Sequence, residues 1–489
     1  MRIIGSEWRL GHWFAVASAS DTYYVRLANK IRDYIRFAGL TGLLTDIEQH
    51  NLAKLITYYF EDVISDVGIW RAFVTAHKEM YGKYLPFYDV DESQYYTDEI
   101  NREDIRFLIW MGIQQYQEGT FINPENPGLV QLADTLYALL DKEFENAPIN
   151  TELVEQMYNP KWFEDFYLMK DWCAQIYRSA YLLQDEQEWD HEDEVEEEFS
   201  KVLEDDNVRD YAIISYLAFC SPIGPLALTV PEWAKYMLKN RGMEREAELF
   251  AGIKCLPYNL YLLKEYDAEV LTLEALDGTL YTVERSSMDS LQDDALEKHH
   301  SLIVSLAVCN GGNWQVCGAT SWFENSEDFY KIREEKGEKT ADDKVLYDRL
   351  MKVTGNYPLI YFAGREDWMQ WLDKNIGLAS DFVEPEQMEE GRNIAVFIFP
   401  DGQLSILPGG ALCIKDDRNP YYNPVQAKKQ AIDFLVVPEM VSKEMLHYLL
   451  EHRMLPDAQI NSLQSPERGR QLIQENIDFV ARFSRKYRY

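Results

Sequence analysis

The residues "AEVLTLEALDGTLYTVE" (268–284) alternate between apolar and polar side chains, turn, and alternate again. Leu271 and Leu273 are two positions apart, which places them on the same face of a β-strand. Asp277 and Gly278 tolerate the positive φ angles of a tight hairpin turn. The alternation on both sides of that pair therefore predicts an antiparallel β-hairpin in the middle of the chain.

The sequence before this hairpin has the spacing of helices. Thr45 and Glu48 form the pattern of a capping box, and the apolar residues after them recur at intervals of three and four. Asn101 precedes a similar apolar stripe and can cap that helix. We expect residues 1–251 to form an all-α domain whose helices bury these stripes against each other.

The sequence after this hairpin mixes strands with helices. A second hairpin is expected in residues 301–323, around Gly311 and Gly312, and a third in residues 393–410. A charged helical stretch separates the two, and helical spacing returns from residue 424 to the end. Such a mixture, without a regular strand–helix–strand repeat, predicts an α+β protein.

The chain is also too long, at 489 residues, for one typical hydrophobic core, so we expect several domains. The changes in spacing suggest where they begin and end. We predict an N-terminal all-α domain (1–251), a central antiparallel β-rich module that forms a small sheet or barrel (252–326), an α+β segment (327–415) and a helical C-terminus (416–489).

Composition limits the function classes. The 83 acidic and 48 basic residues give a net charge of −35, which opposes binding to nucleic acids and to anionic membranes. No stretch reaches the roughly 18–20 apolar residues that a membrane helix needs, and Glu7, Arg9 and His12 interrupt any signal-peptide-like run. The six scattered cysteines include no C-x-x-C pair, which is typical of reduced thiols. We expect a cytoplasmic protein.

The acidic run "DEQEWDHEDEVEEEFSKVLEDD" (185–206) is the most conspicuous feature of the sequence. Val195, Phe199, Val202 and Leu203 within it have the spacing of one apolar helical stripe, so the simplest interpretation is a helix with a solvated acidic surface. A single histidine–glutamate pair is too little for a metal site. The remaining alternative is a surface for a basic protein partner, for which the candidate residues are Glu196, Glu197 and Glu198.

The stretch "DDALEKHH" (293–300) has the spacing closest to that of a metal site. Asp293, Glu297 and His300 would point to one side of a helix. The simpler interpretation is an exposed helix end, where His299 and His300 interact favourably with the helix dipole. The sequence therefore names these residues as metal candidates and identifies no cofactor.

Other chemistry-bearing residues have structural interpretations. His77 lies on an apolar helical face, as a core histidine with one hydrogen bond would. Cys220 and Ser221 could act as nucleophiles only with a base beside them, and no histidine is near them in sequence. The basic C-terminal end, "ARFSRKYRY" (481–489), is interpreted as docking on the protein's own acidic surface. Phosphate-loop, zinc-protease and nucleophile-elbow motifs are absent from the sequence.

Several longer segments resemble a bacterial family built on a domain of unknown function and found mostly in gut anaerobes. The segments that carry the resemblance are "LANKI" (27–31), "YYFEDVISDVGIWRAF" (58–73), "YGKYLPFY" (81–88), "DEINREDIRFLIW" (98–110) and "NPYYNPVQAKKQAIDFL" (419–435). The resemblance spans most of the chain and implies a bacterial, intracellular setting. It implies no activity, cofactor or catalytic residue.

Three functions are compatible with these observations. The first is a protein–protein interaction module whose acidic helical surface engages a basic partner. The second is an enzyme whose site lies at the junction of the helical and β-rich parts, with carboxylates, His299 and His300 as first candidates. The third is an acidic inhibitor or nucleic-acid mimic. The oligomeric state does not follow from the sequence.

Overall fold

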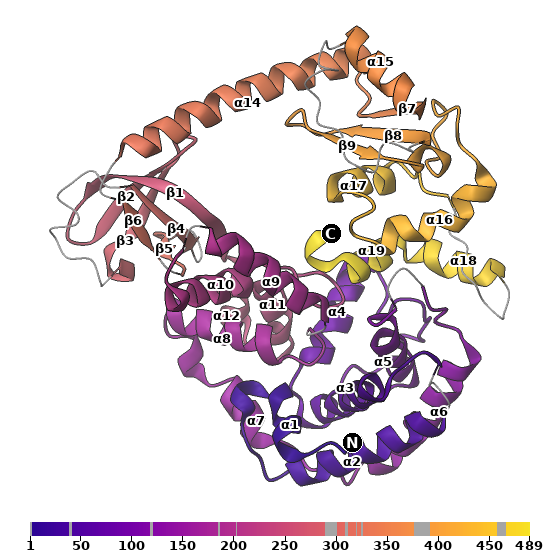
Figure 1. Cartoon of the computed structure of the whole chain (residues 1–489). Helices are drawn as coiled ribbons and strands as arrows, with labels where there is room; N and C mark the ends of the chain where they lie inside the picture. The colour runs from indigo at the N-terminus through magenta and orange to yellow at the C-terminus, as the bar shows by residue number, and fades with distance from the viewer. Residues whose placement is uncertain are drawn as a thin grey trace. The chain divides into compact units, whose positions relative to one another are not determined.

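The structure is a computed structural model of the whole chain (Figure 1). It describes residues 2–38, 42–117, 121–183, 186–201, 203–288, 301–308, 312–318, 320–323, 326–375, 392–456 and 466–489. The N-terminal part is helical, two antiparallel sheets follow, and the C-terminal part is helical again. The α+β prediction is therefore confirmed.

Two compact units make up the chain. The first contains residues 1–117 and 124–332, and the second contains residues 118–123 and 333–489. The helical part and the β-rich part thus belong to one unit, and the boundary falls inside a long helix, α14 (Glu327–Thr354). The finer division into four domains stays a prediction.

Helices occupy most of the first unit before residue 252. Its α-helices are α1 (Gly5–Trp8), α2 (Asp21–Phe37), α3 (Asp46–Ser65), α4 (Ile69–Tyr81), α5 (Arg102–Gln114), α6 (Pro127–Phe144), α7 (Thr151–Met157), α8 (Phe166–Ser179), α9 (Glu186–Ser200), α10 (Asp206–Cys220), α11 (Val230–Asn240) and α12 (Glu244–Ala251). Short 3-10 turns stand at η1 (Arg9–Gly11), η2 (Trp13–Ala15), η4 (Pro160–Phe163) and η5 (Arg285–Met288).

Local sequence signals begin and end these helices. The Thr45 hydroxyl accepts the backbone N–H of Glu48, and the Glu48 carboxylate accepts that of Thr45, so the predicted capping box of α3 is confirmed. Helix α4 lies between Gly68 and Gly82, whose φ angles of +95° and +76° suit residues without a Cβ. Asn101 precedes α5 as expected, but its side chain does not cap that helix.

The core of the helical part is unusually aromatic. Five tryptophans are almost completely buried in it: Trp8, Trp70, Trp110, Trp172 and Trp233. Each large ring removes much apolar surface from water, which is the main stabilising contribution to a helical core. The apolar stripes predicted from the sequence therefore do pack inward, as their spacing requires.

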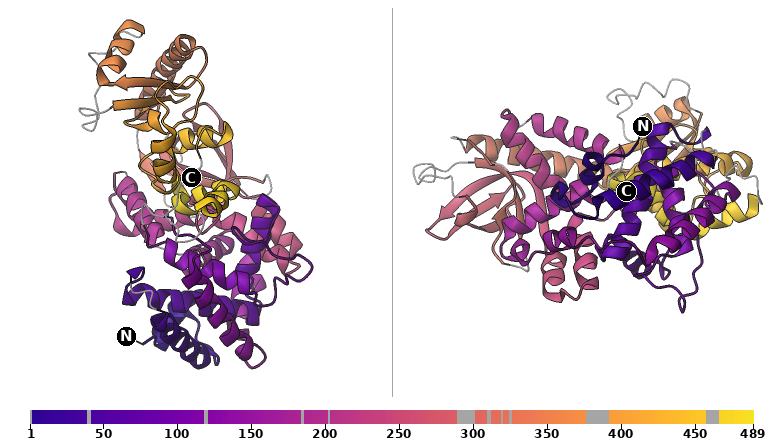
Figure 2. Two further views of the ribbon diagram at one scale, coloured as in Figure 1. Left: turned by 90° about the vertical axis from the view of Figure 1, so that its right-hand side faces the viewer. Right: turned by 90° about the horizontal axis from the view of Figure 1, so that it is seen from below.

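A six-stranded antiparallel sheet follows the helices within the described part of the first unit. Its strands are β1 (Lys254–Tyr266), β2 (Val270–Ala275), β3 (Leu280–Glu284), β4 (Ser301–Val308), β5 (Gln315–Val316) and β6 (Ser321–Phe323). The order is β3-β2-β1-β4-β5, and β6 also pairs with β4. The strands form one layer, coloured pink in Figures 1 and 2.

The first predicted hairpin lies in this sheet as the antiparallel pair β2 and β3. Leu273 pairs with Tyr281, and Gly278 has a φ of +87° in the turn between them. Leu271 and Leu273 are fully buried, so the alternating face forms the core of the sheet. The second hairpin is confirmed by the pairing of β4 with β5 and β6, while Gly311, around which it was predicted, lies outside the described residues.

The second unit combines a three-stranded sheet with helices. After α14 its elements are β7 (Leu359–Gly364), α15 (Arg365–Asn375), β8 (Arg392–Ile398), β9 (Leu404–Leu407), η7 (Gly410–Leu412), α16 (Pro424–Val436), α17 (Lys443–Glu451), α18 (Pro466–Glu475), α19 (Ile477–Arg485) and η8 (Lys486–Arg488). The strand order is β7-β8-β9, which confirms the third hairpin. Trp368 and Leu372 of α15 cover one face of this sheet together with Leu350 of α14.

The basic C-terminal end is occupied by contacts within its own unit. The guanidinium of Arg485 is buried and donates to the carbonyl oxygen of Pro438 at 3.0 Å. Arg482 pairs with Asp478 at 3.0 Å, and Arg488 pairs with Glu439. These cations therefore stabilise the C-terminal helices, partly through acidic side chains and partly through backbone carbonyls, and docking on an acidic surface stays a prediction. Across the described residues, no helix combines the length and the apolarity needed to cross a membrane.

Candidate functional site

The acidic run forms helix α9, and its apolar stripe is buried as predicted. Val195 and Phe199 are each 7% exposed, and Leu203 just beyond the helix is 2% exposed. Val202, the fourth residue of the predicted stripe, lies outside the described residues. The aromatic ring of Phe199 packs against Tyr216 of α10. Helix α9 is therefore attached to the core along one side.

A polar contact reinforces this attachment. His191 Nε2 of α9 lies 2.8 Å from Ser221 Oγ, and the two buried side chains form a hydrogen bond. Ser221 follows directly after α10, so the bond joins the start of one helix to the end of the next. No histidine is near Ser221 in the sequence, and folding brings His191 to it. Because both groups are buried, the pair holds α9 in place and presents no accessible nucleophile.

Helices α9 and α10 together carry a strongly acidic surface. Residues 190–210 contain eleven carboxylates and two cations, which is a net charge of −9. Glu196, Glu197 and Glu198 are all exposed, which agrees with their predicted position on the helix. We define the acidic surface as the exposed carboxylates of α9 and the start of α10: Asp190, Asp193, Glu194, Glu196, Glu197, Glu198, Glu204, Asp205, Asp206 and Asp210.

The cations within this surface neutralise little of it. Arg209 contacts Asp206 at 2.6 Å and Glu196 at 3.9 Å, and Lys201 contacts Glu198 at 2.5 Å. Two apolar side chains are also exposed beside the carboxylates: Val208 at 37% and Tyr211 at 44%. The surface therefore offers dense negative charge next to an aromatic ring.

A buried lysine lies beneath the acidic surface, where the helices meet the β-rich part. Lys170 of α8 is 4% exposed, and its ammonium donates to the hydroxyls of Tyr211 and, at 3.4 Å, Ser215. No carboxylate of the described chain lies within ion-pair distance of it. The Cys317 thiol, just after β5, is close enough for the lysine charge to oppose the rise in its pKa. A buried ammonium without a counter-ion is costly, and the rings of Tyr211 and Tyr167, whose centroids lie 3.8 Å and 5.6 Å from the Lys170 Nζ, offset part of that cost.

The metal candidates cannot be placed. Asp293, Glu297, His299 and His300 all lie outside the described residues, so their predicted spacing stays a prediction. Within the described ranges, no group of three or more His, Cys, Asp or Glu side chains is arranged to hold a metal ion.

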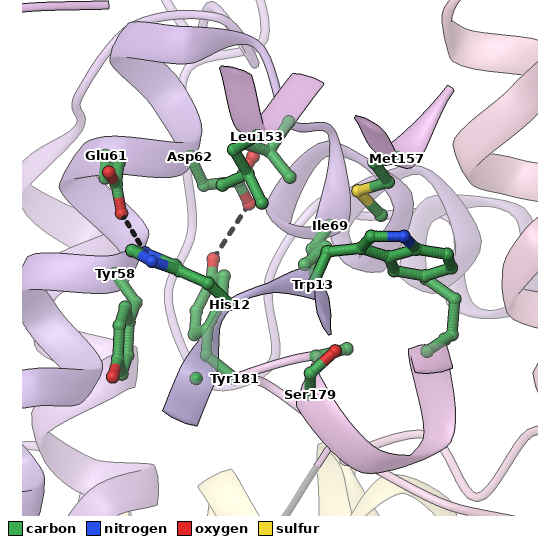
Figure 3. Close-up of a pocket in the computed structure, with 14 residues that line it drawn as sticks. His12, Trp13, Tyr58, Glu61, Asp62, Ile69, Leu153, Met157, Ser179 and Tyr181 are labelled. Carbon is green, nitrogen blue, oxygen red and sulfur yellow. Dashed lines mark hydrogen bonds and ion pairs between the residues drawn. The ribbon is translucent and has the colours of Figure 1, made fainter. Parts of the chain in front are cut away.

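A small cavity with a mostly apolar lining and a few buried polar groups lies among the helices, and the sequence analysis did not predict it (Figure 3). His12 Nε2 donates to Glu61 Oε2 at 2.7 Å, and Asn150 donates to the other oxygen of Glu61 at 2.8 Å. His12 and Glu61 are nearly completely buried. A carboxylate that orients a histidine in this way is typical of general bases. The cavity measures about 30 Å³, room for roughly one or two water molecules and not for a metabolite.

Asp62 follows Glu61 on α3 and also lines the cavity. Its role is to hold neighbouring segments of the chain in place. Its carboxylate accepts the backbone N–H groups of Gly68 and Trp70, each at 2.6 Å, and the hydroxyl of Tyr181 at 2.9 Å. In Figure 3 the hydroxyl of Tyr181 points toward Asp62. Burial raises the pKa of Asp62 to about 6, although these hydrogen bonds oppose the shift. The contacts tie the start of α4 to α3, which is a structural task.

Asp104 of α5 forms a second buried carboxylate cluster. It accepts four hydrogen bonds, from Tyr95 at 2.7 Å, Tyr59 at 2.8 Å, the Trp70 indole at 2.9 Å and Asn101 at 3.1 Å. Burial raises the pKa of Asp104 to about 7, against the effect of these donors. The cluster joins α3, α4 and α5. We name Glu61, Asp62 and Asp104 the core carboxylates.

His77 has the structural role that its position predicts. It is fully buried, and its Nδ1–H donates to the carbonyl oxygen of Lys83 at 2.7 Å. Burial lowers the pKa of His77 to about 4, so the ring is neutral at physiological pH. The interpretation of His77 as a core histidine is confirmed.

Comparison with known proteins identifies a family and no individual relative. A family model described as a protein of unknown function (DUF3843) matches residues 2–251 and 316–486. The matched ranges include the acidic helix and all the core carboxylates, while residues 252–315, with β1 to β4, fall between them. Neither the curated proteins nor the solved structures contain a match.

Proposed function

The chain belongs to the DUF3843 family of proteins of unknown function, and from that premise we propose that it is a cytoplasmic protein–protein interaction module. The acidic surface of α9 and α10 would bind a basic segment of a partner protein. Glu196, Glu197 and Glu198 are its central residues. Nucleic acid is not the expected partner, since a net charge of −35 repels phosphates.

One observation carries this proposal: the exposed carboxylates lie on α9, and the opposite side of that helix is packed against α10. Phe199 and the hydrogen bond between His191 and Ser221 hold α9 against α10. A charged surface held in this way loses little conformational entropy when a partner binds. Dense like charge also destabilises the free protein, which a basic partner would relieve.

The exposed ring of Tyr211 supports the same function. It lies beside the carboxylates, and tyrosines are among the side chains that most often anchor protein interfaces. Long-range attraction would speed the encounter with a basic segment, and the ring would add a short-range contact. The partner that suits this surface is a lysine- or arginine-rich segment that also carries apolar side chains.

The proposal can be tested with a fluorescein-labelled decalysine peptide that ends in tyrosine, by fluorescence anisotropy. We expect Glu196→Gln/Glu197→Gln/Glu198→Gln to weaken binding about tenfold, which corresponds to roughly 1.4 kcal/mol. The matched control is Glu244→Gln/Glu246→Gln/Glu248→Gln on α12, which removes the same charge from another helix of the same unit.

The two triple variants separate local binding from overall charge. We expect the α12 variant to change the dissociation constant less than about twofold, because its charges lie outside the acidic surface. Equal weakening in both variants would show that the peptide responds only to net charge, and would overturn the proposal. Tyr211→Ala should weaken binding further in a way that added salt does not abolish.

A second candidate is an enzyme at the junction of the helical and β-rich parts, and buried Lys170 favours it. Its ammonium is held by two hydroxyls and has no acidic partner in the described chain. Buried lysines without an acidic partner are used in enzymes as binding groups for anions. Tyr211 would connect such a site to the surface, since its ring is partly exposed.

Native mass spectrometry of the protein from its own cells tests this second candidate. A small-molecule adduct that is present on the wild-type chain and absent from Lys170→Met would support a ligand site at the junction. A chain without any adduct in both forms, or an adduct that persists in Lys170→Met, would argue against it. The core carboxylates serve as a control, because Asp62→Asn should leave any such adduct in place.

A further inference from the structure

Three cysteine side chains meet where the helices join the sheet of the first unit. Cys220 is the last residue of α10, Cys255 lies near the start of β1, and Cys317 follows β5. The Sγ atoms of Cys220 and Cys255 are 2.8 Å apart, and Cys255 also shares a hydrogen bond with Cys317. All three are free thiols.

The three thiols differ in how accessible and how acidic they are. Cys220 and Cys255 are half-buried, whereas Cys317 is 1% exposed. The hydrogen bond with Cys220 raises the pKa of Cys255, and its bond with Cys255 and burial raise the pKa of Cys317, with a small opposing effect of Lys170. Thiolates are the nucleophiles in disulfide chemistry. The raised pKa values disfavour the thiolates of Cys255 and Cys317, so we assign the first attack to half-buried Cys220.

We propose that Cys220 and Cys255 are a modification site that forms a reversible disulfide with a low-molecular-weight disulfide such as oxidised glutathione. The Cys220 thiol loses its proton and attacks one sulfur of the small disulfide, whose S–S bond breaks and releases one thiolate. Cys255 then loses its proton and attacks Cys220 Sγ, which releases the second thiolate. The two protons end on the two released thiols, so two electrons pass from the protein to the small disulfide.

The bond would close a covalent loop across the junction. Cys220 and Cys255 are 35 positions apart, and α11 and α12 lie between them. Closing such a loop restricts the unfolded chain, so oxidation should raise the thermal unfolding midpoint of the first unit. Cys255 lies in the segment between the two ranges matched by the family model. The disulfide would thus link that segment to the helical part.

The test uses the full chain, incubated folded in buffers with increasing ratios of oxidised to reduced glutathione. Alkylation, intact mass and peptide mapping without reductant then report the thiols. We expect the folded protein to lose two hydrogens and two alkylatable thiols, with a cross-linked peptide pair that contains Cys220 and Cys255. Dithiothreitol should restore both thiols, and the oxidised form should melt at a higher temperature than the reduced one.

Single variants identify the order of the steps. Cys317→Ser should leave the disulfide intact, Cys220→Ser should abolish it, and Cys255→Ser should trap a glutathione adduct on Cys220. Cys173, which is fully buried, should stay reduced throughout. Two results would overturn the proposal. In the first, Cys220 and Cys255 remain alkylatable at every ratio; in the second, the only cross-link joins Cys255 to Cys317.

Discussion

The acidic surface and the core carboxylates are built from the same side chains and have opposite surroundings. The central glutamates of the acidic surface are exposed to solvent. Each of Glu196, Glu197 and Glu198 contacts at most one cation at short range. Asp104, in contrast, is completely buried and accepts four hydrogen bonds. A carboxylate in solvent needs no partner, whereas a buried one must have donors supplied by the fold.

The contrast shows which carboxylates are available for function. The donors around Asp62 and Asp104 come from neighbouring helices and from the segments between them, so these two carboxylates hold α3, α4 and α5 together. The main attachments of α9 to the core are Phe199 and His191, while Glu196 and Glu198 make only exposed ion pairs with Arg209 and Lys201. Exposed charge with so small a part in the packing is the charge that a partner can use.

The largest effect is expected when a core carboxylate is removed. Asp104→Ala leaves the hydroxyls of Tyr59 and Tyr95 and the indole of Trp70 without their acceptor inside the core. Each unsatisfied buried donor costs about 1–3 kcal/mol, so we expect a loss of roughly 3–5 kcal/mol. Urea unfolding of the first unit, followed by tryptophan fluorescence, measures it.

The matched control is Asp210→Ala, which removes an exposed carboxylate of the acidic surface. Exposed substitutions away from specific contacts usually change stability by less than about 0.5 kcal/mol. A comparable loss in the two variants would erase the distinction between buried and exposed carboxylates.

The second largest effect should be the change in folding stability with pH. Asp104 has a pKa of about 7 in the folded protein and about 3.9 when unfolded. The folded state therefore holds a proton that the unfolded state has already released. The stability linked to this proton is complete below about pH 4 and is lost as the pH rises through 7.

The variant Asp104→Asn keeps the shape of the side chain and cannot ionise. It should therefore gain stability relative to the wild type between pH 5.5 and 8, since only the wild type loses its proton there. Urea unfolding gives the free energy of unfolding of both proteins at the two pH values. Because Asp62 is present in both proteins, its contribution cancels in the difference. Parallel pH profiles would contradict a raised pKa at Asp104.

A smaller loss of stability is expected when the hydrogen bond that attaches the acidic helix α9 to the core is removed. His191→Ala leaves the buried hydroxyl of Ser221 without its partner and loosens the start of α9. We expect a stability loss of about 1–2 kcal/mol and a two- to fivefold weaker affinity for the decalysine peptide. Ser221→Ala, which removes the other half of the bond, should give a similar affinity. Unchanged binding in both variants would mean that the surface does not depend on its attachment.

The smallest effect on stability should come from the surface itself. Glu196→Gln/Glu197→Gln/Glu198→Gln removes charges that are repelled by Asp193 and Glu194, three and four positions away on the same helix. The thermal midpoint of the first unit should rise or fall by less than about 2 °C. A large drop, measured by differential scanning calorimetry, would assign these glutamates to folding and remove them from the candidate surface.

The features that the sequence predicted are local ones. The capping box at Thr45 and Glu48, the turn at Asp277 and Gly278 and the buried face of α9 each depend on residues a few positions apart. Period and turn chemistry are therefore sufficient to infer them. The same reasoning placed Glu196, Glu197 and Glu198 on the exposed side correctly.

The features that the sequence did not predict depend on distant residues. His12 and Glu61 are 49 positions apart, and His191 and Ser221 are 30 apart, so only the fold shows that they meet. One signal was visible in the sequence. The adjacent acids Glu61 and Asp62 interrupt an apolar helix that is buried on nearly all sides, and a buried helix requires partners for such groups.

The central claim is that α9 and α10 form the docking surface, and hydrogen exchange tests it most directly. Backbone amide exchange of the full chain would be followed by mass spectrometry with and without saturating decalysine peptide. We predict slower exchange in residues 190–211 and unchanged exchange in α3 to α5, where the core carboxylates Glu61, Asp62 and Asp104 are buried. Protection elsewhere with none in residues 190–211 would contradict the assignment of function to the acidic surface.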